Sequence, residues 1–174
     1  ELKLGDPMLL ETDIGPVIDE EARANLQKHA DTIVKEAKLL KKLPVPAELA
    51  NGVFFPPHVF EISGIQQLKR EVFGPVLHIA RWKADELGKV CDAINATGYG
   101  LTLGIHSRID ATAEFIRDRV HAGNVYVNRN QIGAVVGVQP FGGEGLSGTG
   151  PKAGGPHYLQ RFSLERTYTV NTTA

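Results

Sequence analysis

The sequence contains a single cysteine, one tryptophan and one methionine among its 174 residues. One cysteine excludes an internal disulfide bond, and we expect a reducing compartment, the cytoplasm. No apolar run approaches the roughly 20 residues that a membrane-spanning helix needs. Neither sign of charge dominates, because 19 basic residues are balanced by 20 acidic ones. This balance argues against a surface that binds nucleic acid or membranes by charge.

The residues that are present indicate a globular protein. The chain is 42% hydrophobic and 22% charged, close to the average for soluble domains, so a core can form. Its length suits one domain or a piece of a larger one. It opens on Glu1-Leu2-Lys3, which reads like the middle of a protein, and we therefore expect a fragment.

A helix is predicted after Asp19, which can cap it. Proline at 44 and 46 ends the predicted helix, and the lysines at 35, 38, 41 and 42 are interpreted as its solvated end. The helical stripe consists of Ala22, Leu26, Ala30, Ile33 and Ala37. Residues 53–60 are apolar but contain two prolines, which predicts an edge or irregular strand.

Strands and helices alternate most clearly between residues 76 and 129. The pattern predicts strands at 76–82, 101–106 and 125–127, a helix over 84–97, and a second helix capped by Asp110. Short connections between such elements imply parallel strands, so the fold class is α/β. Residues 133–155 are rich in glycine and fit no regular element, which is typical of a functional loop or a linker. Residues 159–170 are expected to form one or two late strands.

Three features invite a functional interpretation that the local sequence does not support. Residues 143–148 match G-x-G-x-x-G, but no strand precedes them and no helix follows, so close backbone packing is the better interpretation. Cys91 lies in the apolar stripe of its helix, which predicts an inert core residue. The six histidines lack metal-ligand spacing, and no metal site is expected.

Glu71, beside a Gly-Pro turn, could chelate two vicinal hydroxyls or be a surface acid, and the residues alone leave both open.

Several short segments occur together in an order and at spacings that resemble the aldehyde dehydrogenase superfamily over nearly the whole chain. They are Gly5-Asp6-Pro7, Ile14-Gly15-Pro16-Val17-Ile18, Glu71-Val72-Phe73-Gly74-Pro75-Val76, Asn95 with Tyr99-Gly100-Leu101-Thr102, Ala122-Gly123-Asn124-Val125-Tyr126-Val127-Asn128, Gln139-Pro140-Phe141-Gly142-Gly143 and Ser147-Gly148. Residues 129–156 and 161–166 are more closely similar to the glutamate-semialdehyde (1-pyrroline-5-carboxylate) dehydrogenase branch, in particular to the dehydrogenase half of bifunctional bacterial proline utilization A proteins.

The resemblance implies a fold and a set of site residues. Residues 1–174 would be the C-terminal part of a parallel-sheet catalytic domain that ends in an oligomerisation strand at about 159–170. Glu71 would hold the nicotinamide-ribose hydroxyls of NAD, and Phe73 would pack beside the same end of the cofactor. Gly133 and Ala134 would bind the substrate's backbone carboxylate through their amides, and Phe141 would flank its aliphatic part.

The resemblance also implies what lies outside these residues. The family's catalytic cysteine, general-base glutamate, oxyanion asparagine and NAD-binding domain all correspond to positions before residue 5, so no catalytic residue is assigned here. Expected partners are glutamate semialdehyde, the remainder of a parent chain and a second copy, with FAD only if a proline dehydrogenase domain precedes. Two alternatives remain: a dehydrogenase for another aldehyde, such as succinate semialdehyde, and a catalytically dead assembly module.

Overall fold

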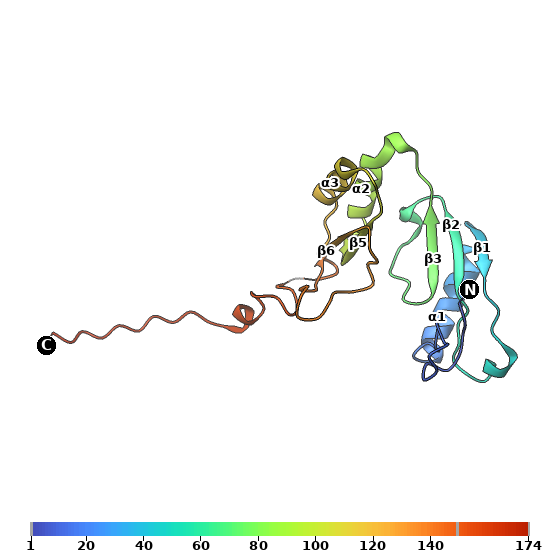
Figure 1. Cartoon of the computed structure of the whole chain (residues 1–174), viewed down its shortest axis with the longest axis horizontal. Helices are drawn as coiled ribbons and strands as arrows, with labels where there is room; N and C mark the ends of the chain where they lie inside the picture. Colours follow the sequence, from blue (N-terminus) through green and yellow to red (C-terminus); the bar gives the residue numbers. More distant parts are fainter. Residues whose placement is uncertain (1, 149, 174) are drawn as a thin grey trace. The chain divides into compact units, whose positions relative to one another are not determined.

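The computed structural model describes residues 2–148 and 150–173. The chain divides into two compact units, Glu1–Lys83 (unit 1) and Ala84–Ala174 (unit 2). Figure 1 labels the α-helices and the longer strands of both. None of the helices in the described part is long and apolar enough to cross a membrane. Short 3-10 helices occupy Ala47–Leu49, Ile65–Gln67, Ala84–Glu86 and Leu159–Phe162.

Helix α1 (Glu20–Ile33) of unit 1 begins where the sequence predicts. Asp19 Oδ1 accepts the amide hydrogen of Ala22 at 2.7 Å, which satisfies one of the amides that the first turn leaves free. Acidic residues fill the first turn, near the positive end of the helix dipole. The buried residues of the helix are Leu26, Ala30 and Ile33, all members of the predicted stripe.

The predicted extension of this helix to the prolines at 44 and 46 is wrong. Helix α1 ends at Ile33, and Lys38–Lys42 form strand β1. Strand β1 pairs antiparallel with β2 (His58–Ile62), which supplies the backbone hydrogen bonds that a longer helix would have made within itself. The lysines predicted at a helix end therefore lie mostly on a strand at the edge of the sheet. Charged side chains at such an edge oppose pairing with a further strand.

Strand β2 is the central strand of this sheet, between β1 and the parallel strand β3 (Val76–Ala80). This corrects the prediction of an edge or irregular strand over residues 53–60. Both prolines of that segment precede the ladder, which begins at His58, so no missing amide interrupts it. Side chains along β2 alternate between buried and half-buried positions.

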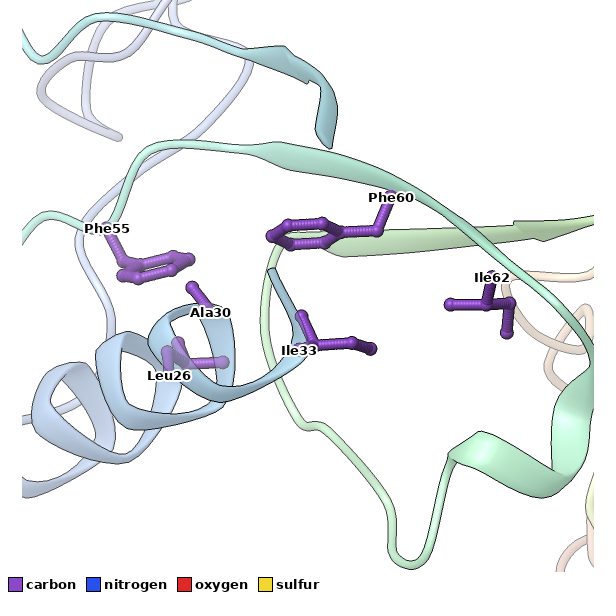
Figure 2. Packing of buried hydrophobic residues seen from close by; sticks show 6 residues of the cluster. All are labelled: Leu26, Ala30, Ile33, Phe55, Phe60 and Ile62. Carbon is purple, nitrogen blue, oxygen red and sulfur yellow. The ribbon is translucent and has the colours of Figure 1, made fainter. Parts of the chain in front are cut away.

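The core of unit 1 lies between α1 and the sheet (Figure 2). Its largest side chains are Phe55 and Phe60, which are 2% and 1% exposed. Burying each ring stabilises the unit by roughly 1.5–3 kcal/mol relative to leaving it in water. The aliphatic members of the same cluster are Leu26, Ala30, Ile33 and Ile62.

Unit 2 repeats a helix–strand order. Helix α2 (Leu87–Asn95) leads through β4 (Tyr99–Gly100) into β5 (Thr102–Ile105), and α3 (Asp110–Arg119) leads into β6 (Asn124–Val127). Strands β5 and β6 are parallel, as predicted. The elements predicted between 76 and 127 are present, but they do not form one sheet, because β3 pairs with β2 in unit 1.

Two local predictions for unit 2 need correction. Asp110 is the first residue of α3 rather than its cap, and the Oγ of Ser107 accepts the amide hydrogen of Ile109 just before the helix. The late strand expected at 159–170 begins instead as the 3-10 helix Leu159–Phe162, and the described residues after it have no regular structure. A strand needs a partner to bond its backbone, and these residues pair with none in the described chain. Their role in oligomerisation stays a prediction.

Three histidines of unit 1 lie in or beside the core. His58 is 3% exposed and stacks between Phe55 and Phe60, with ring centroids 4.8 Å and 5.7 Å away. The Nε2 atoms of His29 and His78 lie 2.9 Å apart, so one ring donates a hydrogen to the other. Two protonated rings would bring two N–H donors into contact. Burial is the main cause that lowers the pKa of all three below the ordinary value of 6.5.

Acidification should therefore destabilise unit 1. As the pH falls through 6.5, the unfolded chain binds protons that the folded histidines, with their lowered pKa, do not yet accept. The free energy of unfolding then decreases until the pH reaches the lowered values. Arg70 acts with burial on His29 and Lys42 acts with burial on His58, while Asp31 and the Pro56 carbonyl oppose the shift of His58.

Urea unfolding at about pH 8 and about pH 5.5 measures this dependence. The midpoint should be lower at the acidic pH, and His78→Gln should weaken the difference. The exposed His121 of unit 2 provides the control, and His121→Gln should leave the difference intact. Equal midpoints at both pH values in the unmodified chain would contradict the prediction.

Candidate functional site

Glu71 and Phe73 lie on the segment that leads into β3 of unit 1. Val72, the residue between them, packs against the core. Its two neighbours therefore face away from the core, as alternate residues of an extended segment do. Glu71 is exposed, and its carboxylate makes no ion pair among the described residues. The ring of Phe73 is 87% exposed. A carboxylate and an uncovered aromatic ring are thus available together to a ligand.

Gly74 fixes this segment against α1. A side chain at this position would collide with Leu26, because an added Cβ would lie 2.5 Å from its Cδ1 atom. Leu26 is itself only 3% exposed and has little room to move. Glycine therefore permits a close approach that holds the preceding residues on the surface of the core.

A cavity of about 230 Å³ lies beside the same segment, between α1 and residues 67–72. Lys28, Lys69 and Arg70 give the cavity three cationic side chains, against the single carboxylate of Glu36. Its other lining residues are His29, Thr32, Ile33, Gln67, Leu68 and Val72. This excess of positive charge favours an anionic group close to Glu71 and Phe73.

Gly133 and Ala134 lie in unit 2, on the loop that follows β6. Both are half-buried, and neither amide donates a hydrogen bond to another described residue. The turn at residues 135–139 makes hydrogen bonds within itself. The Val135 carbonyl accepts amide hydrogens from Val138 and Gln139, and the Gln139 side chain accepts the amide hydrogen of Val135 at 3.0 Å. Three hydrogen bonds thus hold this turn, while the two preceding amides make none within the described chain and remain available as donors.

Phe141 follows this turn and is held from several sides. Its amide and carbonyl groups both pair with the backbone of Ala153, at 3.0 Å and 2.9 Å. The side chain of Asn124 bonds the backbone on either side of it, at Pro140 and Gly142. Phe141 as a whole is half-buried. The geometry offers a fixed aromatic surface.

The match to G-x-G-x-x-G at 143–148 packs as predicted, against other backbone. Residues Glu144–Gly145 form the short strand β7, which pairs antiparallel with β4. A Cβ added at Gly143 would lie 2.5 Å from the carbonyl oxygen of Ser147, and Gly145 has a φ of +59°. The Oγ of Ser147 accepts the amide hydrogen of Gly100. These glycines are accounted for by contacts with the chain itself.

Cys91 is 1% exposed, and burial raises the pKa of its thiol. Both facts confirm the prediction of an inert core residue. Within the described residues, no group of three or more His, Cys, Asp and Glu side chains is arranged to hold a metal ion.

The structure places the five predicted site residues in two sets. Glu71 and Phe73 lie together in unit 1, whereas Gly133, Ala134 and Phe141 lie along one loop of unit 2. A sixth residue, Asn124, holds this loop. It lies in the segment 122–128 that carries the family resemblance, but the resemblance gave it no role. A further signal in the sequence is an asparagine at the start of a strand, where β-propensity disfavours it.

Comparison with known proteins places both sets in context. The model of the aldehyde dehydrogenase family matches residues 1–168. Bifunctional protein PutA of Rhizobium meliloti is 51% identical over 156 residues, which cover 90% of this chain and 13% of the relative. The 1-pyrroline-5-carboxylate dehydrogenase of Geobacillus sp. (strain WCH70) is 40% identical over 161 residues, which cover 91% of this chain and 30% of the relative. The chain therefore spans less than a third of the length of either relative.

Solved structures agree with the sequence comparison. A mutant of Bradyrhizobium japonicum proline utilization A (PutA) is 58% identical with a TM-score of 0.93, over 99% of this chain and 17% of that chain. A mutant of Thermus thermophilus 1-pyrroline-5-carboxylate dehydrogenase is 36% identical with a TM-score of 0.81, over 92% of this chain and 31% of that chain. The family uses NAD or NADP in general. By its sequence over residues 1–168 and by its fold, the chain belongs to the aldehyde dehydrogenase family.

Proposed function

We propose that the chain is part of a longer NAD+-dependent dehydrogenase that oxidises L-glutamate γ-semialdehyde, the open form of 1-pyrroline-5-carboxylate, to glutamate. The names of its relatives, bifunctional protein PutA and 1-pyrroline-5-carboxylate dehydrogenase, support this substrate. The observation that carries the proposal is the pair of unbonded amides at Gly133 and Ala134.

These amides suit the feature that distinguishes this aldehyde from simple ones. Glutamate semialdehyde has a carboxylate and an amino group at the end opposite the aldehyde. Consecutive backbone N–H groups bind an anion well, and a carboxylate can accept from both. A Cβ added at Gly133 would meet nothing within 4 Å, so the chain leaves open space beside these donors. That space can admit the carboxylate.

Phe141 would contact the middle of the same molecule. The semialdehyde has two methylene groups between its backbone carbon and its aldehyde. An accessible, fixed aromatic ring favours such an aliphatic chain and excludes water from it. The substrate would thus be held at its charged end and along its length, while the aldehyde stays free for reaction.

Glu71 and Phe73 fit the nicotinamide end of NAD+, which supplies the hydride acceptor. The exposed carboxylate can accept hydrogen bonds from two vicinal ribose hydroxyls, and the exposed Phe73 ring gives an apolar surface beside them. One aldehyde, one NAD+ and one water would give one carboxylate, one NADH and two protons. We assign no nucleophile to this chain, since its one cysteine is buried. A contact between copies through residues 159–170 remains a prediction.

The substrate proposal is tested by NADH formation in the full-length polypeptide that carries this segment. With 1-pyrroline-5-carboxylate, kcat/KM should exceed that for propanal by about 100-fold, because only the former can use the amide donors. Succinate semialdehyde provides a second comparator, with a carboxylate but no amino-acid backbone. Gly133→Val fills the open space and should raise KM for 1-pyrroline-5-carboxylate by at least about tenfold.

The controls separate this effect from misfolding. Ile132, which precedes Gly133, is 90% exposed, and Ile132→Ala should leave kcat/KM for both substrates unchanged. Gly133→Val should leave kcat/KM for propanal within about twofold. A preference for propanal or succinate semialdehyde would overturn the substrate while keeping the family. Cofactor binding without turnover of any aldehyde would indicate a non-catalytic module.

The cofactor role of Glu71 is tested by Glu71→Gln in the same polypeptide. Glutamine keeps the shape of the side chain. It replaces the charged carboxylate that accepts hydrogen bonds from the ribose hydroxyls by a neutral amide. KM for NAD+ should rise about five- to tenfold, while thermal stability stays unchanged because Glu71 makes no ion pair in the described chain. Glu48→Gln, at another exposed acid of unit 1, is the matched control. An unchanged KM for NAD+ would exclude the assigned contact.

A further inference from the structure

Asn124, the first residue of β6, binds the loop that carries Phe141. Its Nδ2 atom donates to the Pro140 carbonyl at 2.9 Å, and its Oδ1 atom accepts the Gly142 amide hydrogen at 3.2 Å. The residue is 9% exposed, so both bonds are sheltered from water. One side chain thus bonds the residues immediately before and after Phe141, in the way a neighbouring strand would.

The other polar groups of this segment are also paired. The backbone of Phe141 bonds Ala153 in both directions, and the Gly142 carbonyl accepts a hydrogen bond from Lys152 Nζ at 2.9 Å. Among the described residues, Asn124 is the side chain that bonds this segment from β6, since Ala153 and Lys152 belong to the same long loop. The loop is tied again at β7, which pairs with β4 from Glu144 on. Asn124 is therefore the direct link between β6 and the backbone on either side of Phe141.

The residue before Asn124 makes this contact possible. A Cβ added at Gly123 would overlap the carbonyl oxygen of Gly142, so the two backbones approach as closely as glycine allows. Asparagine carries both the donor and the acceptor that these two bonds require. Aspartate lacks the donor for the Pro140 carbonyl.

We propose that Asn124 is a specificity-determining positioning residue, which fixes Phe141 against the aliphatic part of the substrate through the Pro140 and Gly142 backbone. This inference rests on the proposed function, because it requires that Phe141 contacts the semialdehyde. If the segment were loosened, the Phe141 ring could move away from the substrate. A long substrate such as the semialdehyde would then lose more binding free energy than a short one such as propanal.

A double-mutant cycle in the full-length polypeptide tests the proposal. Asn124→Ala and Phe141→Ala should each raise KM for 1-pyrroline-5-carboxylate about tenfold, with kcat/KM for propanal within about twofold. The double variant should be no worse than Phe141→Ala alone, because Asn124 acts through that ring. Asn124→Gln keeps a donor and an acceptor on a longer side chain and should give an intermediate KM, which also covers the case that Asn124→Ala does not fold.

Asn95 supplies a matched control within unit 2. Its side chain also bonds two backbone groups, donating to the Arg119 carbonyl at 2.7 Å and accepting the His121 amide hydrogen at 2.9 Å. Asn95→Ala removes a similar pair of bonds from another segment and should lower stability without changing the substrate preference.

Each remaining outcome overturns a defined step. If the Asn124 variants reduce turnover of both aldehydes equally, or if their effect adds to that of Phe141→Ala, Asn124 is structural only and the inference is wrong. If Phe141→Ala is selective but the Asn124 variants are not, the inference fails while the proposed function stands. If Phe141→Ala itself changes neither substrate, the assigned contact of Phe141 fails, and the inference fails with it.

Discussion

The two hydrogen bonds of Asn124 hold the glycine-rich loop of unit 2 against the end of β6. Without them, the Pro140 carbonyl and the Gly142 amide would lose their partners in a half-buried place, at a cost of about 1–3 kcal/mol for each unsatisfied group. The same bonds keep Phe141 at a fixed distance from the sheet. The proposed contribution of the loop to substrate binding therefore depends on one buried side chain that is not itself assigned a ligand contact.

In unit 1, hydrophobic packing rather than hydrogen bonding positions the candidate residues. Val72 packs against the hydrophobic core and Gly74 packs against Leu26. Glu71 and Phe73 therefore face outward. The apolar core thereby exposes the carboxylate of Glu71, which makes no ion pair with the residues that the structure describes, and the ring of Phe73. In both units, the candidate groups lie beside residues that are packed or hydrogen-bonded within the described chain.

Local signals in the sequence predict the elements that depend on local interactions. The start of α1 follows from Asp19 and the acids after it, and the helix α2 with its buried Cys91 follows from the apolar spacing around that residue. Strand β1 could not be predicted in this way, because its lysine-rich residues take strand conformation only through pairing with β2. The candidate ligand contacts came from resemblance. The role of Asn124 depends on a loop that folds back from 16 and 18 residues away, which no periodicity indicates.

The most direct measurement is a crystal structure of the full-length polypeptide with L-glutamate, the proposed product, in the dehydrogenase site. The account predicts the α-carboxylate within about 3 Å of the Gly133 and Ala134 amide nitrogens, with the Phe141 ring along the methylene groups. A glutamate bound through other donors, with these two amides facing solvent, would contradict the central claim that this loop recognises the substrate.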